Sequence, residues 1–210
     1  MNAPVAVVIL AAGKGTRMKS DLPKVLHRIA GRPLLHHVLA ASETLSPERR
    51  VVVLAPGQED VAASVAPIPT AIQHPPRGTG DAVRAALGEL DGFTGTVLVL
   101  FGDTPMLSQD TLTQMVAETE GPDGAAFVIL GFESDAPGRY ARLVLDDAGN
   151  LLRIIEAPDL KGEESAIRLC NGGALAVDGA RLADWLGRLE PHNAQGEFYL
   201  FDLLQFAREE

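Results

Sequence analysis

Four short apolar runs in the first 131 residues limit what this chain can fold into more than any other feature. The runs are continuous rather than alternating, and they are Pro4–Ala12, Val51–Ala55, Thr96–Phe101 and Ala125–Gly131. Such runs are typical of strands that are buried on both faces, as in a parallel sheet. The first run resembles the core of a signal peptide. However, no Lys or Arg precedes it and charges follow at once, so we interpret it as a strand.

The segments between these runs have the apolar spacing of amphipathic helices. They are Leu34–Leu45, Glu59–Val65, Asp81–Leu90 and Gln109–Glu118. Strands that alternate with helices in this way form βαβ units. We therefore predict an α/β, Rossmann-like fold with a mostly parallel central sheet and helices on both faces.

The last third of the chain changes character. Arg142–Asp146 and Leu151–Glu156 flank the turn 148–150 and predict a β-hairpin, and Ile167–Val177 predicts a strand that two glycines interrupt. Two further segments predict helices: Asp178–Leu189 and Phe198–Arg208. No stretch rich in Ser, Gly and Pro divides the chain, so we predict a single domain over residues 1–210.

The charge of the chain is unevenly distributed. The 210 residues carry a net charge of −10, which disfavours a nucleic-acid partner because an acidic surface repels phosphates. Residues 1–36 nevertheless hold six Lys and Arg against one acid, Asp21, a local charge of +5. This distribution favours a small anionic ligand held locally, the alternative being Lys and Arg that are simply solvated.

Cysteine content and hydropathy exclude several further classes. Cys170 is the only cysteine, so an intramolecular disulfide or a multi-cysteine metal site cannot form. No apolar run approaches the roughly 20 residues that span a bilayer. We expect a cytoplasmic protein without a membrane partner.

A glycine-rich loop with nearby cations follows the first predicted strand. In Leu10–Met18, small residues and glycines let backbone N–H groups approach an anion, and Arg17 and Lys24 add positive charge. The loop lacks the G-x-x-x-x-G-K-[ST] pattern of a P-loop. It also lacks the third glycine of the dinucleotide fingerprint, where Met18 stands.

The string LAAGKGTRMKSDLPKVLH at residues 10–27 resembles the signature of sugar-1-phosphate nucleotidyltransferases. The likeness is greatest to the uridylyltransferase domain of the bifunctional enzymes that make UDP-N-acetylglucosamine. The resemblance implies that Arg17 and Lys24 contact phosphates and that Lys24 supports the transition state. It also implies a nucleotide-binding part over about residues 1–130 and a sugar-binding part over about 131–210. The loop residues it assigns to the nucleotide are Leu10, Ala11, Ala12, Gly13 and Gly15.

A second segment that matches the family is the stretch from Ala71 to Gly80. The resemblance implies that Gln73, Gly78 and Thr79 contact the uracil and its ribose. Glutamine can offer a donor–acceptor pair to a pyrimidine edge, and glycine allows close approach. His74 and Asp81 depart from the commoner family residues. Without the resemblance, this segment is typical of an ordinary helix start.

A third segment, Phe101-Gly102-Asp103, follows a predicted buried strand. Open α/β sheets bind ligands at the carboxyl ends of their strands, and a carboxylate there suits Mg²⁺. The resemblance implies that Asp103 is a Mg²⁺ ligand and that Phe101 and Gly102 border the nucleotide. The alternative is that Asp103 caps a helix.

Five later residues match positions that border the sugar in this family. They are Ala141, Glu156, Asn171, Glu197 and Tyr199. Carboxylates and an amide can hydrogen-bond with sugar hydroxyls and an N-acetyl group. Ala141 stands where the family usually has glycine, so its methyl group either alters the fit of the sugar or is tolerated. Without the resemblance, Glu156 and Asn171 are typical of polar residues at strand ends.

Two features of the family are not found in this sequence. The second Mg²⁺ ligand is an asparagine that follows the Tyr-x-x-Asp segment, whereas the asparagines here are Asn2, Asn150, Asn171 and Asn193. The acetyltransferase half is also absent. We therefore expect a fragment, a stand-alone short form or a chain with impaired metal binding. Without the other half, we expect a monomer or a weak homo-oligomer.

The resemblance implies an enzyme whose substrates are UTP and N-acetylglucosamine 1-phosphate. The products would be UDP-N-acetylglucosamine and pyrophosphate, with Mg²⁺ as the cofactor. Two alternatives stay open. One is a sister nucleotidyltransferase that uses another sugar phosphate or nucleotide, and the other is a non-catalytic module that binds nucleotide sugars.

Overall fold

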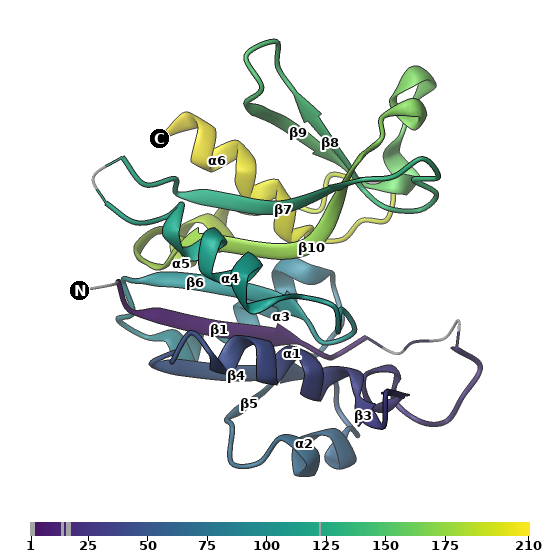
Figure 1. Ribbon diagram of the computed structural model, residues 1–210, viewed down its shortest axis with the longest axis vertical. Coiled ribbons are helices and arrows are strands. Elements are labelled where there is room, and N and C mark those ends of the chain that lie inside the picture. Colours follow the sequence, from purple (N-terminus) through teal and green to yellow (C-terminus); the bar gives the residue numbers. More distant parts are fainter. Residues whose placement is uncertain (1–2, 14, 16–17, 122) are drawn as a thin grey trace.

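The computed structural model describes residues 3–13, 15, 18–121 and 123–210. Within them, an eight-stranded sheet runs in the order β5-β4-β1-β6-β10-β8-β9, with β7 paired to β10 (Figure 1). The strands are β1 (Val5–Leu10), β4 (Arg49–Leu54), β5 (Thr70–Ile72), β6 (Thr96–Phe101), β7 (Phe127–Glu133), β8 (Arg142–Leu145), β9 (Leu151–Ile155) and β10 (Leu169–Asp178). A separate two-stranded ribbon pairs β2 (Arg28–Ile29) with β3 (Arg32–Pro33).

Helices cover both faces of this sheet. They are α1 (Leu34–Glu43), α2 (Glu59–Val65), α3 (Thr79–Ala85), α4 (Gln109–Ala117), α5 (Gly179–Arg188) and α6 (Leu203–Glu209). Short 3₁₀ helices are η2 (Lys24–Leu26), η3 (Leu87–Leu90), η4 (Ala157–Asp159), η5 (Gly162–Ala166) and η6 (Leu200–Asp202). The predicted α/β fold is confirmed. No helix among the described residues is both long and apolar enough to cross a membrane.

The sheet has a parallel part and an antiparallel part. Strands β5, β4, β1 and β6 are parallel, whereas β10 runs antiparallel to β6, β7 and β8. The sequence groups β7 with the parallel strands, yet β7 pairs with β10 in antiparallel register. This happens because β10 takes the position beside β6 that a fifth parallel strand would occupy.

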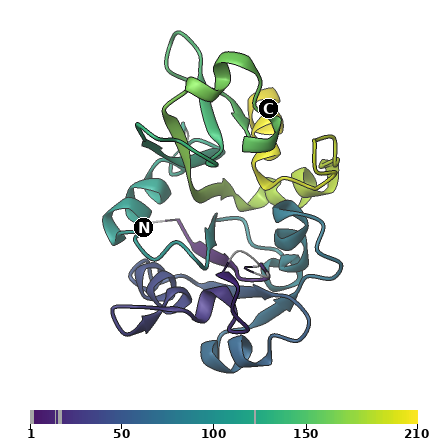
Figure 2. The same ribbon diagram turned by 90° about the vertical axis from the view of Figure 1, so that its right-hand side faces the viewer.

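Strand β10 connects the two parts of the sheet. Its residues after the bulge pair with β6, and Cys170 before the bulge pairs with Arg142 of β8. The register with β7 shifts between Asn171 and Leu175, where the sequence has the two predicted interrupting glycines. Figures 1 and 2 show the result, with the β8–β9 hairpin at one end of the molecule and the parallel strands at the other.

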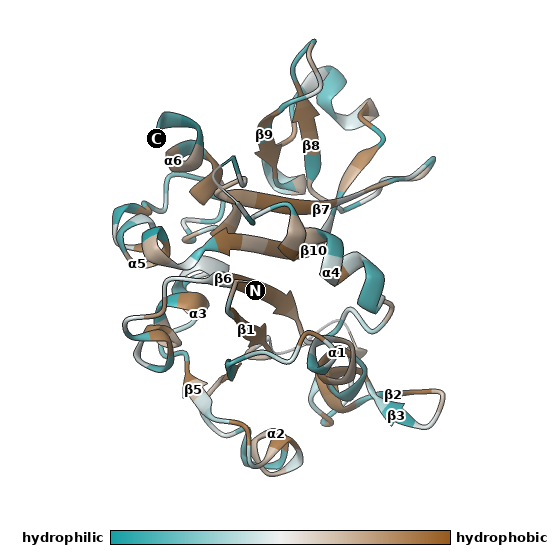
Figure 3. Cartoon of the chain, turned by 60° about the vertical axis from the view of Figure 1, so that its left-hand side comes forward, coloured by the Kyte–Doolittle hydropathy of each residue, from teal (hydrophilic) through white to brown (hydrophobic). Residues whose placement is uncertain are grey.

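The alternation of side chains along the strands divides the core into two layers. On β1, Ala6 and Val8 pack with α3, α5 and α6, while Val7 and Ile9 pack with α1, α2 and α4. Neighbouring side chains of a strand point to opposite faces, so a sheet covered on both sides needs apolar residues at every position. Figure 3 shows these strands as hydrophobic, with hydrophilic residues on the outer sides of the helices.

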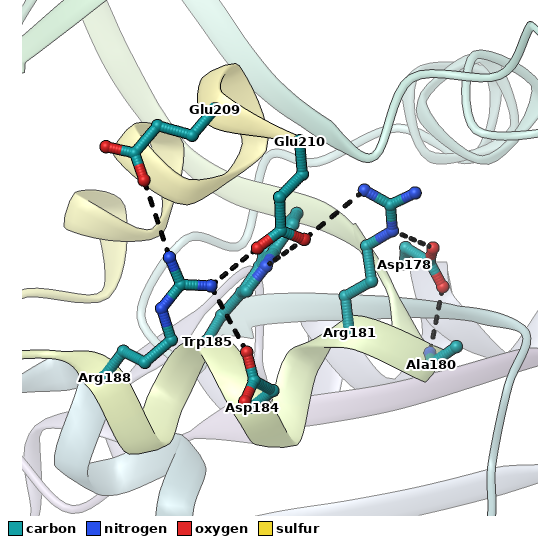
Figure 4. Close-up of polar contacts among 8 residues, drawn as sticks. All are labelled: Asp178, Ala180, Arg181, Asp184, Trp185, Arg188, Glu209 and Glu210. Carbon is teal, nitrogen blue, oxygen red and sulfur yellow. Dashed lines mark hydrogen bonds and ion pairs between the residues drawn. The ribbon is translucent and has the colours of Figure 1, made fainter.

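A polar cluster fastens the end of α6 to α5 (Figure 4). The Trp185 ring is fully buried, and its Nε1 donates to Glu210 Oε2 at 3.2 Å. Arg188 Nη1 donates to Glu210 Oε1 at 2.6 Å. At the start of α5, Asp178 accepts from the backbone N–H of Ala180 at 2.9 Å. This cluster links Glu210, which follows α6, to Trp185 and Arg188 of α5.

Two predicted helices differ from the observed ones, and one short strand was missed. The predicted helix Asp81–Leu90 starts at Thr79 and gives way to η3 after Ala85, near Gly88, a poor helix former. The predicted helix Phe198–Arg208 becomes α6 only at Leu203. Tyr199 is extended, Leu200–Asp202 form η6, and Phe198 and Leu200 hydrogen-bond with the start of α3. The short strand β5 was not predicted, since its three residues show no clear periodicity.

Candidate active site

The carboxyl ends of β1 and β6 meet at one edge of the sheet. The backbone N–H of Gly102 donates to Leu10 O at 2.9 Å, and the N–H of Ala11 donates to Val53 O at 2.8 Å. The predicted nucleotide-binding residues of the two loops are therefore neighbours in space. This edge is where open α/β sheets bind their ligands.

Lys24 and Asp103 form an ion pair across these two loops. Lys24 Nζ, at the start of η2, contacts Asp103 Oδ2 just after β6. Their side chains are 34% and 26% exposed, so a ligand can still reach both charges. The structure thus brings the predicted catalytic lysine and the predicted metal ligand into direct contact.

The backbone of the first loop approaches Lys24 closely at Gly15. A Cβ atom at Gly15 would lie 2.6 Å from Lys24 Cβ, and the residue has a φ of +58°. Both features favour glycine at this position. Ala12 and Gly13 precede it in the loop that follows β1. Arg17 lies outside the described residues, so its predicted contact with phosphates stays a prediction.

The surroundings of Asp103 fit a metal ion that is shared with a substrate. Among the described residues, no group of three or more His, Cys, Asp or Glu side chains could hold a metal by itself. Mg²⁺ commonly takes one or two carboxylates and completes its shell with waters and phosphate oxygens. Asp103 suits that pattern. The capping alternative is wrong, because Ser108 caps the next helix, α4, by accepting from the N–H of Thr111.

Gln73 is buried beside the start of α3 with its amide group held firmly. The side chain is 5% exposed, and Nε2 donates to Gly78 O at 2.9 Å and to Asp81 Oδ2 at 3.1 Å. Both hydrogens of the amide are therefore used within the protein. The expectation that Gln73 offers a donor and an acceptor to a base is wrong for the donor, and only Oε1 remains available.

The start of α3 is built against the C-terminal segment. Gly80 N donates to Phe198 O at 2.8 Å, and Leu200 N donates to Thr79 Oγ1 at 2.9 Å. Gly78 has a φ of +111°, and a Cβ there would lie 2.6 Å from Phe198 O, so only glycine fits. The alternative interpretation also holds, since Gly78 and Thr79 do begin a helix.

An acidic cluster lies in the predicted sugar-binding part. Burial, followed by the charges of Asp202, Asp159 and Glu197, raises the pKa of Glu156. Burial and Asp159 raise the pKa of Asp202 to about 6, and burial together with the four acids raises the pKa of Tyr199 to about 12. Each group therefore lies within the electrostatic reach of the others.

Two members of this cluster, Asp159 and Asp202, were not predicted from the sequence. Each follows a predicted sugar-binding residue by three positions, in Glu156-x-x-Asp159 and Tyr199-x-x-Asp202. They lie on the 3₁₀ helices η4 and η6, where residues three apart lie on the same side. That spacing is the signal that could have identified them.

Asn171 and Ala141 lie side by side in the β8–β10 part of the sheet. Asn171 N donates to Ala141 O at 2.9 Å, and Asn171 Oδ1 accepts from Gly173 N at 2.8 Å. Asn171 thus supports the bulge of β10. A Cβ at Gly173 would lie 3.6 Å from the Phe101 ring, so this bulge adjoins the end of β6. The two predicted parts of the site are neighbours here.

Comparison with known proteins identifies the family. The model of the MobA-like NTP transferase domain matches residues 7–170. The chain belongs to this family. This confirms its assignment to the nucleotidyltransferases and agrees with the resemblance that its sequence motifs indicate.

Curated relatives of this NTP transferase chain carry the name bifunctional protein GlmU. The protein of Paramagnetospirillum magneticum is 47% identical over 207 residues, which cover 99% of this chain and 46% of the relative. That of Rhodospirillum rubrum is 49% identical over 203 residues, covering 97% and 45%. The chain spans about half the length of these relatives.

A solved structure shares the fold of this NTP transferase chain. It is described as UDP-glucose pyrophosphorylase complexed with UDP-glucose. The two superpose with a TM-score of 0.78 at 15% sequence identity, covering 99% of this chain and 88% of that one. The roles of the individual site residues described above stay predictions.

Proposed function

We propose that this chain transfers a uridylyl group from UTP to N-acetylglucosamine 1-phosphate and releases pyrophosphate. The observation that carries the proposal is the Lys24–Asp103 pair at the carboxyl ends of β1 and β6. A cation and a carboxylate at this edge suit a nucleotide triphosphate, and the GlmU relatives support this substrate class.

The proposed reaction is an in-line displacement at the α-phosphorus of UTP. An oxygen of the sugar phosphate attacks, the bond to the pyrophosphate oxygen breaks, and no covalent enzyme intermediate forms. Catalysis of this kind depends on positioning and on neutralising charge. Lys24, held by Gly15 and Asp103, would stabilise negative charge on the phosphates. Asp103 would hold a Mg²⁺ ion, which would neutralise further charge when bound.

The other described residues would position the two substrates. Gln73 and Gly78 lie where the resemblance implies contact with the base, and Gln73 presents Oε1 as an acceptor. Glu156 and Glu197 would accept hydrogen bonds from sugar hydroxyls. The acids around Glu156 favour a sugar without a negative charge, because a further anion would be repelled there.

A sister activity on another sugar phosphate is the second candidate. Ala141 is 6% exposed and stands where the family usually has glycine, so its methyl group fills space beside the predicted sugar site. The UDP-glucose pyrophosphorylase with the same fold illustrates a different sugar. Comparing N-acetylglucosamine 1-phosphate with glucose 1-phosphate distinguishes the two candidates.

The test is pyrophosphate release from UTP and N-acetylglucosamine 1-phosphate in the presence of Mg²⁺. We expect turnover that stops when EDTA removes the metal. Binding of UDP-N-acetylglucosamine without turnover would instead favour a non-catalytic module. Turnover only with another sugar phosphate or nucleotide would favour the sister activity.

A further inference from the structure

Asp81 is a buried carboxylate on the first turn of α3, next to the predicted base-binding residues. It is 6% exposed, and both of its oxygens have partners. Oδ1 accepts from Arg77 Nε at 3.2 Å and Nη2 at 2.7 Å, while Oδ2 accepts from Gln73 Nε2 at 3.1 Å. Asp81 therefore links a charged side chain to the amide of Gln73.

These contacts leave Gln73 one orientation. Nε2 faces Gly78 O at 2.9 Å as well as the Asp81 carboxylate, and both groups can only accept hydrogen bonds. A flipped amide would place Oε1 against a carbonyl and a carboxylate, leaving two buried acceptors opposed. Gln73 is thus held with Oε1 on the other side, where it accepts no hydrogen bond from the part of the chain that the structure describes.

Arg77 holds the Asp81 carboxylate in the position where it can accept from Gln73. Its guanidinium lies over the Phe198 ring, 5.5 Å from the centroid, and its backbone oxygen accepts from Phe198 N at 2.8 Å. The Arg77–Asp81 pair supplies a charge partner for a carboxylate that would otherwise be buried alone, which is costly. The orientation of Gln73 therefore depends on a connected set of contacts.

We infer that Asp81 is a positioning residue that determines base specificity, because it fixes Gln73 as a hydrogen-bond acceptor. This inference rests on the proposed function, in which Gln73 meets the base. A fixed acceptor pairs with the N3–H of uracil and opposes the N3 lone pair of cytosine. Opposed polar groups in a buried site lower affinity strongly, so this geometry selects UTP over CTP.

The first experiment measures the ratio of kcat/KM for UTP to that for CTP. We expect the wild-type chain to prefer UTP and Asp81→Asn to lower the ratio about tenfold or more, since asparagine can face Gln73 with either end of its amide. Asp81→Ala, which removes the constraint altogether, should lower it too. A ratio does not depend on how much protein folds, so reduced stability of a variant does not affect the result.

Asp178→Asn is the matched control. It makes the same chemical change at another helix start, beside the opposite end of β6, where Asp178 pairs with Thr96. This variant should keep the wild-type ratio. If both Asp81 variants also kept that ratio, the inference would be overturned.

The second experiment needs no substrate. In the ¹⁵N-labelled wild-type chain, we expect the Gln73 side-chain amide protons to exchange slowly with water, with the signal assigned by its loss in Gln73→Met. Asp81→Asn should accelerate this exchange about tenfold or more. An unchanged exchange rate would overturn the inference, whatever ratio of kcat/KM the enzyme shows for UTP and CTP. Absence of any nucleotide turnover in the wild type would instead overturn the proposed function.

Discussion

The ammonium of Lys24 and the carboxylate of Asp103 pair across the loops that follow β1 and β6. Neither side chain is fully buried, and neither belongs to the two core layers. An arrangement of this kind contributes little to folding, so its loss should affect chemistry far more than stability.

Replacing the lysine tests this directly. Lys24→Ala should lower kcat for pyrophosphate release about 100-fold or more, the range seen when one charge-stabilising group is removed. The free energy of unfolding should change by about 1 kcal/mol or less, as for a partly exposed ion pair. Arg50→Ala is the control, because it breaks the Arg50–Glu43 pair away from the site. Near-normal rates in a folded Lys24→Ala chain would refute the role of Lys24.

Asp103→Asn should raise the Mg²⁺ concentration needed for half-maximal turnover about tenfold or more, because an amide is a weaker ligand for a hard cation than a carboxylate. Metal titrations of pyrophosphate release measure this. Asp110→Asn, an exposed position in the first turn of α4, provides the comparison. If the two variants require the same Mg²⁺ concentration, Asp103 does not hold the metal.

The acidic cluster predicts how stability varies with pH. The pKa of Asp202 is raised to about 6 in the folded chain, so the folded state binds this proton more tightly than the unfolded state. The stability contributed by protonated Asp202 is therefore present below about pH 4 and is lost as the pH rises toward 6. At pH 7, Asp202→Asn should stabilise the fold by about 1 kcal/mol, a figure reduced for solvent screening.

Urea unfolding at pH 4.5 and pH 7 checks this dependence. The gain from Asp202→Asn should be larger at pH 7 than at pH 4.5. The exposed Asp60→Asn variant on α2 should show no such difference. A gain that is the same at both values would mean that Asp202 titrates normally.

Gly78→Ala should destabilise the fold by about 2 kcal/mol or more and reduce nucleotide binding, because the added Cβ meets the backbone of Phe198 at a positive φ. Gly88→Ala is the matched control, since a Cβ there meets nothing within 4 Å. Denaturant unfolding compares the two. Equal stability of both variants would contradict the close approach between the start of α3 and Phe198.

The parallel part of the sheet could be predicted from the sequence because its strands are covered on both faces. Burial of every side chain on β1 requires the continuous apolar run that reveals it. The pairing of β7 could not be predicted, since its apolar residues do not specify a partner strand. That partner is set by β10, which begins 36 residues after β7 ends.

The candidate site, like the fold, could be predicted from the sequence only in part. Lys24, Asp103 and Gln73 could be selected from local motifs, and the structure places them at or beside the expected sheet edge. The contact of Asp81 with Gln73 could not be predicted, because it depends on the direction of one amide group, which no sequence pattern records. Asp159 and Asp202 were missed because single acids on short 3₁₀ turns resemble ordinary surface residues.

The hydrogen bond from Leu200 N to Thr79 Oγ1 joins residues 121 positions apart. During synthesis on a ribosome, the strands and helices of the N-terminal half emerge long before Leu200 does. A growing chain can therefore assemble its parallel strands while the start of α3 still lacks its C-terminal partner. Contacts of such long sequence separation form slowly, because a long loop must close first. We therefore expect the start of α3, where the family resemblance places the base, to be completed only after the segment around Phe198 has been synthesised.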